Sequence, residues 1–252
     1  MTENGDFIYP IISLHFQTKY NESIVKQHVT ENGILLRYVP VEKRTAELCT
    51  LAVANDGLSI LHVPIEQLTS DICAIAISQN GKSLLCIYDS LRSQTNNIEI
   101  NDIITAESCV TAVKQWGDAL YYIMRYQPLF VTTKLIVSAV NNDGLAIRHV
   151  FTSRINSSQV KELYNFCLVS VSQNGLALKH IPFDFHTPAL YLASLSQNGT
   201  ALQFVPVEKQ TRELCMVAVD QTVHAIQYIP NEHFAFIQKQ YNINTCSTCI
   251  IS

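Results

Sequence analysis

The chain has 252 residues, of which 48% are hydrophobic and 15% are charged, and its net charge is −4. This composition provides enough apolar side chains for a sizeable core and too little charge for a disordered chain. The absence of a Lys and Arg cluster excludes the basic footprint of a nucleic-acid-binding protein. No apolar run approaches the ~20 residues of a membrane helix, so no membrane partner is expected.

The first 28 residues are expected to form a degenerate N-terminal cap, because the dipeptide Asn4-Gly5 has the same sequence as Asn32-Gly33 of the first regular unit. The chain begins with an acidic segment that lacks the basic n-region of a signal peptide. A cytoplasmic protein is therefore expected.

Glycine marks a repeat along the chain. All eight glycines fall at one position of a unit, and the commonest gap between successive glycines is 24 residues. The seven that define the period are Gly33, Gly57, Gly81, Gly117, Gly144, Gly175 and Gly199. A further copy has Val223 in the glycine position. Such a period is typical of a repeat array, so we expect residues 29–230 to be stacked copies within a single domain, 1–252.

Each unit is expected to begin with a helix of about three turns. Thr45 can cap the helix start through its hydroxyl, and the Glu47 carboxylate suits the positive end of the helix dipole. The apolar residues on one face of this helix are Leu48, Cys49, Ala52 and Val53. An Asn-Gly or Asp-Gly pair usually follows, and we expect its glycine to end the helix in the left-handed conformation.

The second segment of each unit, such as Leu176 to Ile181, has fixed apolar positions three residues apart. This spacing favours a short second helix that ends at Pro182. A strand is the rival interpretation, because leucine-rich repeats have a similar period, but their Leu-x-x-Leu-x-Leu signature is missing. The sequence therefore predicts an all-α solenoid of about eight short helix-pair repeats. Residues 231–252 are expected to form a C-terminal cap and tail.

Insertions lengthen some gaps, and they must lie between the recurring proline and the capping threonine of the next unit. The insert at about residues 89–101 is polar, and inserts in repeat proteins often project from a binding face. Its candidate partner-binding residues are Arg92, Gln94, Asn96 and Asn97. A merely tolerated loop is an equal alternative.

The cysteines are candidate residues for a metal site or a redox site. Five of them share one column of the repeat with Ile136 and Tyr191, which indicates core packing: Cys49, Cys73, Cys109, Cys167 and Cys215. Cys246 and Cys249 have the C-x-x-C spacing of a zinc half-site or a redox pair. A zinc site needs further ligands and thioredoxin-like chemistry needs a βαβ context, and both are missing.

Histidines also share a column, at His62, His149 and His180, together with Tyr, Phe and Cys in other copies. We interpret this column as a half-exposed aromatic ladder, because adjacent rungs are commonly too far apart to share a metal. No nucleophile–base motif or phosphate-binding loop is present. The sequence thus predicts no catalytic residues, no cofactor and no metal.

The segments 174–182 (Asn-Gly-Leu-Ala-Leu-Lys-His-Ile-Pro) and 211–219 (Thr-Arg-Glu-Leu-Cys-Met-Val-Ala-Val) resemble a known repeat family. It is the short domain-of-unknown-function repeat that mimivirus-type giant viruses encode in many copies, and that some amoeba-associated bacteria share. The resemblance covers about residues 29–230 and implies no catalytic residues.

These observations predict a non-enzymatic scaffold that binds an unidentified protein partner, and the resemblance implies a viral protein in the host cytoplasm. Solenoids present extended surfaces that suit such a role. A structural or virion-associated component is the first alternative. A thiol-redox protein that uses Cys246 and Cys249 is the second.

Overall fold

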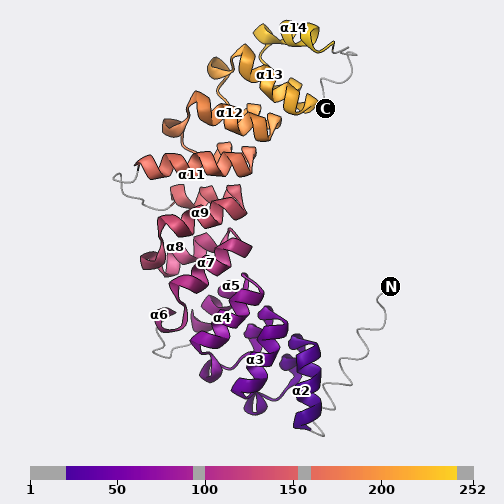
Figure 1. Cartoon of the computed structure of the whole chain (residues 1–252), viewed down its shortest axis with the longest axis vertical. Coiled ribbons are helices and arrows are strands. Elements are labelled where there is room, and N and C mark those ends of the chain that lie inside the picture. The colour runs from indigo at the N-terminus through magenta and orange to yellow at the C-terminus, as the bar shows by residue number, and fades with distance from the viewer. Residues whose placement is uncertain (1–20, 93–99, 153–159, 243–252) are drawn as a thin grey trace. The chain divides into compact units, whose positions relative to one another are not determined.

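The computed structural model describes residues 21–92, 100–152 and 160–242, and the regular elements in these ranges are helices (Figure 1). The expected all-α fold is confirmed, because these ranges contain no β-strand. The chain divides into two compact units, unit 1 (Met1–Val131) and unit 2 (Thr132–Ser252), which are described separately. None of the helices in the described ranges is both long and apolar enough to cross a bilayer.

Each repeat begins with an α-helix, which we call its first helix. In unit 1 the first helices are α2 (Glu22–Glu31), α3 (Ala46–Asn55), α4 (Ser70–Gln79) and α7 (Ala106–Gln115). In unit 2 they are α9 (Thr133–Asn142), α11 (Val160–Gln173), α12 (Pro188–Gln197) and α13 (Arg212–Gln221). Consecutive first helices of a unit pack against each other. Because α2 starts at Glu22, a regular repeat begins inside the segment that was expected to be a cap.

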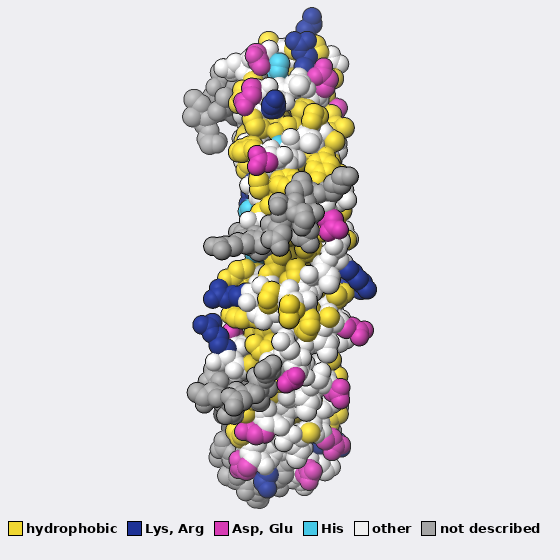
Figure 2. All heavy atoms as spheres, turned by 90° about the vertical axis from the view of Figure 1, so that its left-hand side faces the viewer, with side chains coloured by type: hydrophobic (Ala, Val, Ile, Leu, Met, Phe, Trp, Pro, Cys, Tyr) yellow, Lys and Arg dark blue, Asp and Glu magenta, His cyan; other side chains and the backbone are white. Residues whose placement is uncertain are grey.

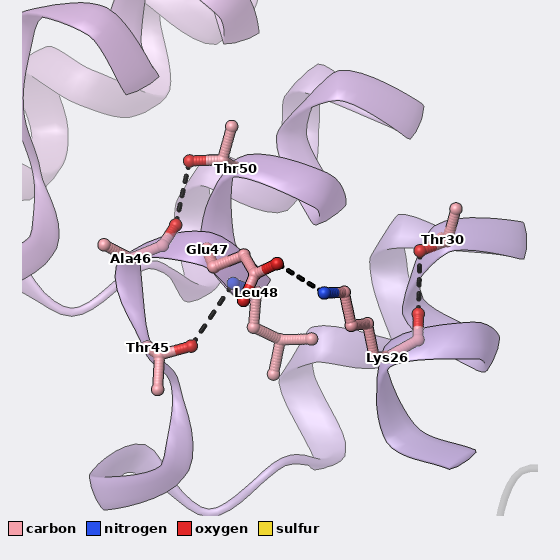
Figure 3. Close-up of polar contacts among 7 residues, drawn as sticks. All are labelled: Lys26, Thr30, Thr45, Ala46, Glu47, Leu48 and Thr50. Carbon is pink, nitrogen blue, oxygen red and sulfur yellow. Dashed lines mark hydrogen bonds and ion pairs between the residues drawn. The ribbon is translucent and has the colours of Figure 1, made fainter. Parts of the chain in front are cut away.

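The threonine caps expected from the sequence are confirmed. The Thr45 hydroxyl accepts a hydrogen bond from the Leu48 backbone N–H at 3.3 Å (Figure 3). The equivalent bonds, between 3.1 and 3.4 Å, are made by Thr69, Thr105, Thr132, Thr187 and Thr211. Figure 3 also shows Glu47, in the first turn of α3, paired with Lys26 of α2. This ion pair links two neighbouring repeats.

The second segment is a 3₁₀-helix in most repeats, so the helical interpretation is confirmed over the strand. In unit 1 these second helices are η1 (Gly33–Tyr38) and η3 (Gly57–His62). In unit 2 they are η8 (Gly175–His180), η10 (Gly199–Phe204) and η12 (Val223–Tyr228). A third, unexpected element follows the proline in four repeats, as the turns η2 (Val41–Lys43), η4 (Ile65–Gln67), η9 (Phe183–Phe185) and η11 (Val207–Lys209).

Three repeats have an α-helical second segment instead, and these are the repeats without the recurring proline. They contain α5 (Ser83–Arg92), α8 (Ala119–Tyr126), and η6 (Gly144–Ala146) followed by α10 (Ile147–Thr152). Tyr88, Met124 and Phe151 occupy the proline position. A residue with a backbone N–H can continue a helix there, whereas proline cannot. The remaining elements are α6 (Ile100–Ile103) and η5 (Pro128–Phe130) in unit 1 and α14 (Asn231–Gln240) in unit 2.

The expected left-handed role of glycine is wrong. No described glycine has a positive φ. The residue before the glycine is extended in most repeats, and in several of them its side chain caps the second helix, as Asp56 does by accepting from the Leu58 N–H at 3.0 Å. Gly57 is required for a different reason, since a Cβ built on it would stand 2.4 Å from the Ala76 carbonyl oxygen of the following first helix. The glycine thus permits close packing between repeats.

A side-chain amide near the end of a first helix ties it to the preceding repeat. Gln79 Oε1 accepts from the Gly57 N–H at 2.6 Å, and Gln79 Nε2 donates to the Asn55 carbonyl at 3.1 Å. The same two kinds of contact are made by Asn55, Gln115, Gln173, Gln197 and Gln221. This amide ladder, which the sequence analysis missed, repeats within both units.

Candidate binding surface

The five cysteines of the repeat column lie in the core, and their predicted packing role is confirmed. Each is 0% exposed. Burial raises the pKa of the Cys49 thiol to about 11 and that of the Cys73 thiol to about 12. A thiol that keeps its proton at neutral pH is a weak nucleophile and metal ligand. The other candidate pair, Cys246 and Cys249, lies outside the described residues.

The three column histidines lie on second helices, at partly exposed positions. Burial lowers the pKa of His62 and His180, so both rings are neutral at pH 7. In the ranges with described structure, no three His, Cys, Asp or Glu residues gather as a potential metal site. The aromatic ladder stays a prediction from the sequence.

Of the predicted partner-binding loop, only Arg92 is described. It is exposed at the end of α5, and its Nη1 donates to the Tyr126 hydroxyl at 3.4 Å. Gln94, Asn96 and Asn97 lie outside the described residues. The binding role of this loop stays a prediction.

Unit 2 contains a hollowed surface that the sequence analysis missed. Its largest part, which we call the apolar hollow, is an open depression of about 580 Å³. Residues in its wall include Ile181, Phe183, Val205, Val207, Gln210 and Tyr228. Phe183 is 71% exposed and Val207 is 61% exposed, although both side chains are large and apolar. Figure 2, which views the left-hand side of Figure 1, shows hydrophobic side chains of unit 2 with acidic side chains between them.

Two smaller hollows adjoin the apolar hollow. One, of about 330 Å³, shares Val207 and Gln210 with it and adds Glu213 and Glu232. The other, of about 450 Å³, shares His186 with the apolar hollow and adds the 48%-exposed Leu192. The three hollows surround the turn η11, and we call them together the η11 surface.

His186 holds the wall of this surface in place. One of its ring nitrogens, Nε2, lies 2.9 Å from the Ile181 carbonyl, and Nδ1 lies 3.3 Å from the Tyr191 hydroxyl. Its ring packs against Phe183, with centroids 4.8 Å apart, and edge-on against Tyr191 at 5.4 Å. Burial lowers the pKa of His186. The ring is therefore neutral at pH 7, with Nε2–H donating to the carbonyl.

The sequence did carry a signal for this surface. The residue directly after the recurring proline is apolar in four copies, namely Val41, Ile65, Phe183 and Val207. Because proline ends the second helix, this position does not belong to the buried stripe of either helix. An apolar column outside both stripes is a candidate contact surface.

No model of a known protein family, no curated protein and no solved structure matches the chain.

Proposed function

We propose that the chain is one solenoid of about eight short helix-pair repeats with a 24-residue core period, acting as a non-enzymatic scaffold that binds a protein partner. The repetition of the threonine caps, the glycine contacts and the amide ladder in both units supports the solenoid. The resemblance to giant-virus repeats supports a viral origin and a site in the host cytoplasm.

The observation that carries the binding role is the exposure of large apolar side chains around a hollow. Phe183, Val207 and Leu192 are 71%, 61% and 48% exposed on the η11 surface. Covering apolar area contributes about 25 cal/mol per Å². Clustered exposed apolar residues with a polar rim are a common mark of protein-binding sites. A partner segment that covers these three side chains would remove them from water.

The state of the possible nucleophiles supports a role without catalysis. The column thiols are buried, and their pKa values are raised. His186, one of the two histidines of the η11 surface, has both ring nitrogens in hydrogen-bond contact, one with a backbone carbonyl and one with a tyrosine. Neither arrangement pairs an activated nucleophile with a base.

The test is capture of a partner from host cells by the tagged full chain, followed by reconstitution with the purified partner. The double variant Phe183→Ser/Val207→Ser is expected to lower the affinity at least tenfold. Leu61→Ser is the matched control, since Leu61 is also an exposed apolar residue, at 54%, but lies in unit 1. Equal affinities for the double variant and the wild type would contradict the proposal.

A further inference from the structure

Two segments of the chain are almost identical and differ at two positions, 44/210 and 46/212, of which the first lines the apolar hollow in the second copy. Residues 39–49 read VPVEKRTAELC, and residues 205–215 read VPVEKQTRELC. Arg44 in the first copy corresponds to Gln210 in the second. Both residues directly precede the threonine that caps a first helix. The two copies thus place two different side chains at equivalent backbone positions.

In unit 1 the Arg44 guanidinium is surrounded by backbone carbonyls. Its Nε donates to the Val39 carbonyl at 2.8 Å, and its Nη2 donates to the Arg37 carbonyl at 3.1 Å. Its Nη1 reaches the following repeat and donates to the His62 carbonyl at 2.7 Å. One guanidinium therefore bridges two repeats.

In unit 2 the shorter Gln210 stays within its own repeat. Its Nε2 donates to the carbonyls of Val205, at 2.8 Å, and Leu202, at 3.1 Å. These two acceptors fix the orientation of the amide, because its nitrogen must face them. The Oε1 atom is buried without a hydrogen-bond partner, and Gln210 is 5% exposed. An unsatisfied buried acceptor requires a donor.

The apolar hollow lies where unit 1 has the guanidinium. The counterparts of Arg37, Val39 and His62 are residues that line it: Gln203, Val205 and Tyr228. Gln210 lines it as well. The hollow thus contains an unpaired acceptor, Gln210 Oε1. It is also lined by backbone that corresponds to the backbone around the Arg44 guanidinium in unit 1.

We propose that the apolar hollow binds the side chain of an arginine from the partner protein. This inference rests on the proposed function and names the chemistry of the contact. The guanidinium donates to Gln210 Oε1 and to the backbone beside Tyr228, and its aliphatic stem packs against Phe183 and Val207. A planar group with five donors fits several fixed acceptors better than a lysine ammonium does.

Hydrogen bonds, and not long-range attraction, make this site selective. The walls of the three hollows carry the carboxylates of Glu208, Glu213 and Glu232, and also the cations Lys179, Lys209 and Arg212. Arg212 itself stacks over the Phe236 ring, with its Cζ 4.5 Å from the ring centroid. Because the charges nearly balance, we expect the affinity for an arginine to depend only weakly on salt.

The experiment is an NMR titration of the full chain with N-acetyl-arginine methylamide. We expect saturable shifts of the Gln210 side-chain amide and of the Val205 and Val207 backbone amides. The citrulline analogue has the same shape but carries a carbonyl oxygen, which cannot donate, in place of one guanidinium nitrogen, and we expect it to bind at least tenfold more weakly. The lysine analogue is also expected to bind at least tenfold more weakly. Equal binding of the arginine and citrulline compounds, or shifts confined to other residues, would overturn the inference.

A variant provides the second test. Gln210→Arg reproduces the Arg44 arrangement, so it is expected to fold, to fill the hollow and to abolish the shifts. Arg44→Gln, the control in unit 1, is expected to leave shifts around Gln210 unchanged. In the partner assay, Gln210→Arg is expected to lower affinity at least tenfold, and unchanged affinity contradicts the inference. If Phe183→Ser/Val207→Ser weakens the partner while Gln210→Arg does not, the proposed function stands and the arginine contact fails.

Discussion

Gly57 lies so close to Ala76 that a Cβ on the glycine would stand 2.4 Å from the alanine carbonyl oxygen. Ala76 belongs to α4, the first helix of the next repeat, and is 0% exposed. The glycine column and the column of small residues, which are separate patterns in the sequence, are therefore the two sides of one contact between repeats.

This contact predicts that Gly57→Ala destabilises the protein. The added methyl group meets a backbone carbonyl, which cannot rotate away as a side chain can, and overpacking of this kind costs about 1–3 kcal/mol. Urea denaturation of the two proteins measures the difference. Val223→Ala is the control, because Val223 occupies the glycine position but is 67% exposed, and its effect should stay within about 0.5 kcal/mol. Equal losses at the two positions would count against the packing account.

The amide ladder predicts a second loss of stability. Gln79→Ala removes both hydrogen bonds of the side chain and leaves the N–H of Gly57, a buried residue, without its acceptor. A loss of about 1–3 kcal/mol in the free energy of unfolding is expected. Gln203→Ala is the comparison, since the exposed Gln203 makes one local bond, to the Thr200 carbonyl. In thermal denaturation the melting temperature of Gln79→Ala should be clearly lower than that of Gln203→Ala. The reverse order would refute the role of the ladder.

Exchanging the side chains of Arg44 and Gln210 should have opposite effects on stability. Arg44→Gln loses the bond from Nη1 to the His62 carbonyl, which joins two repeats, and should destabilise the chain by about 1–3 kcal/mol. Gln210→Arg gains the equivalent bond and removes an unpaired acceptor, so its melting temperature should rise. Calorimetry on both variants checks this pair of outcomes. A lower melting temperature for Gln210→Arg would show that the two copies are not equivalent.

The buried thiols predict a fall in stability at alkaline pH. The Cys73 thiol has an ordinary pKa of 9.0, and burial raises it to about 12 in the folded protein. Between these values the unfolded chain loses a proton that the native protein keeps, so the free energy of unfolding falls as pH rises, by at most about 1.4 kcal/mol per pH unit for each thiol. Cys73→Val should make this dependence shallower in urea denaturation above pH 9. An unchanged slope would contradict burial of this thiol.

The sequence predicts the helices well because their signals are local. Thr45 caps α3 through a hydroxyl three residues before its donor, and Pro182 ends η8 by its own covalent structure. The reason for the glycine was missed, since Gly57 is required by a carbonyl of the next repeat and not by its own backbone conformation. A recurring glycine shows that a side chain is not tolerated at that position. It does not show whether the cause is the glycine's own backbone conformation or a neighbouring repeat.

The η11 surface was missed for a related reason. Valine is a residue type usually found in the core. Val207 is exposed because it follows Pro206 and so lies outside the first and the second helix of its repeat. The unpaired oxygen of Gln210 depends on the path of the backbone in the following repeat, which the glutamine does not reach. The sequence shows that Gln210 replaces Arg44 in the second copy. Only the structure shows the backbone carbonyls that accept hydrogen bonds from each of these side chains.

Photocrosslinking from the η11 surface tests the central claim most directly. The photoreactive residue p-benzoylphenylalanine would replace Phe183 in one protein and the equally apolar Leu61 in another, and both would be irradiated with the partner in host-cell extract. The account predicts one strong adduct from position 183, of the same mass in repeated experiments, that is lost in the Gln210→Arg background. An adduct from position 61 with none from position 183 would contradict it.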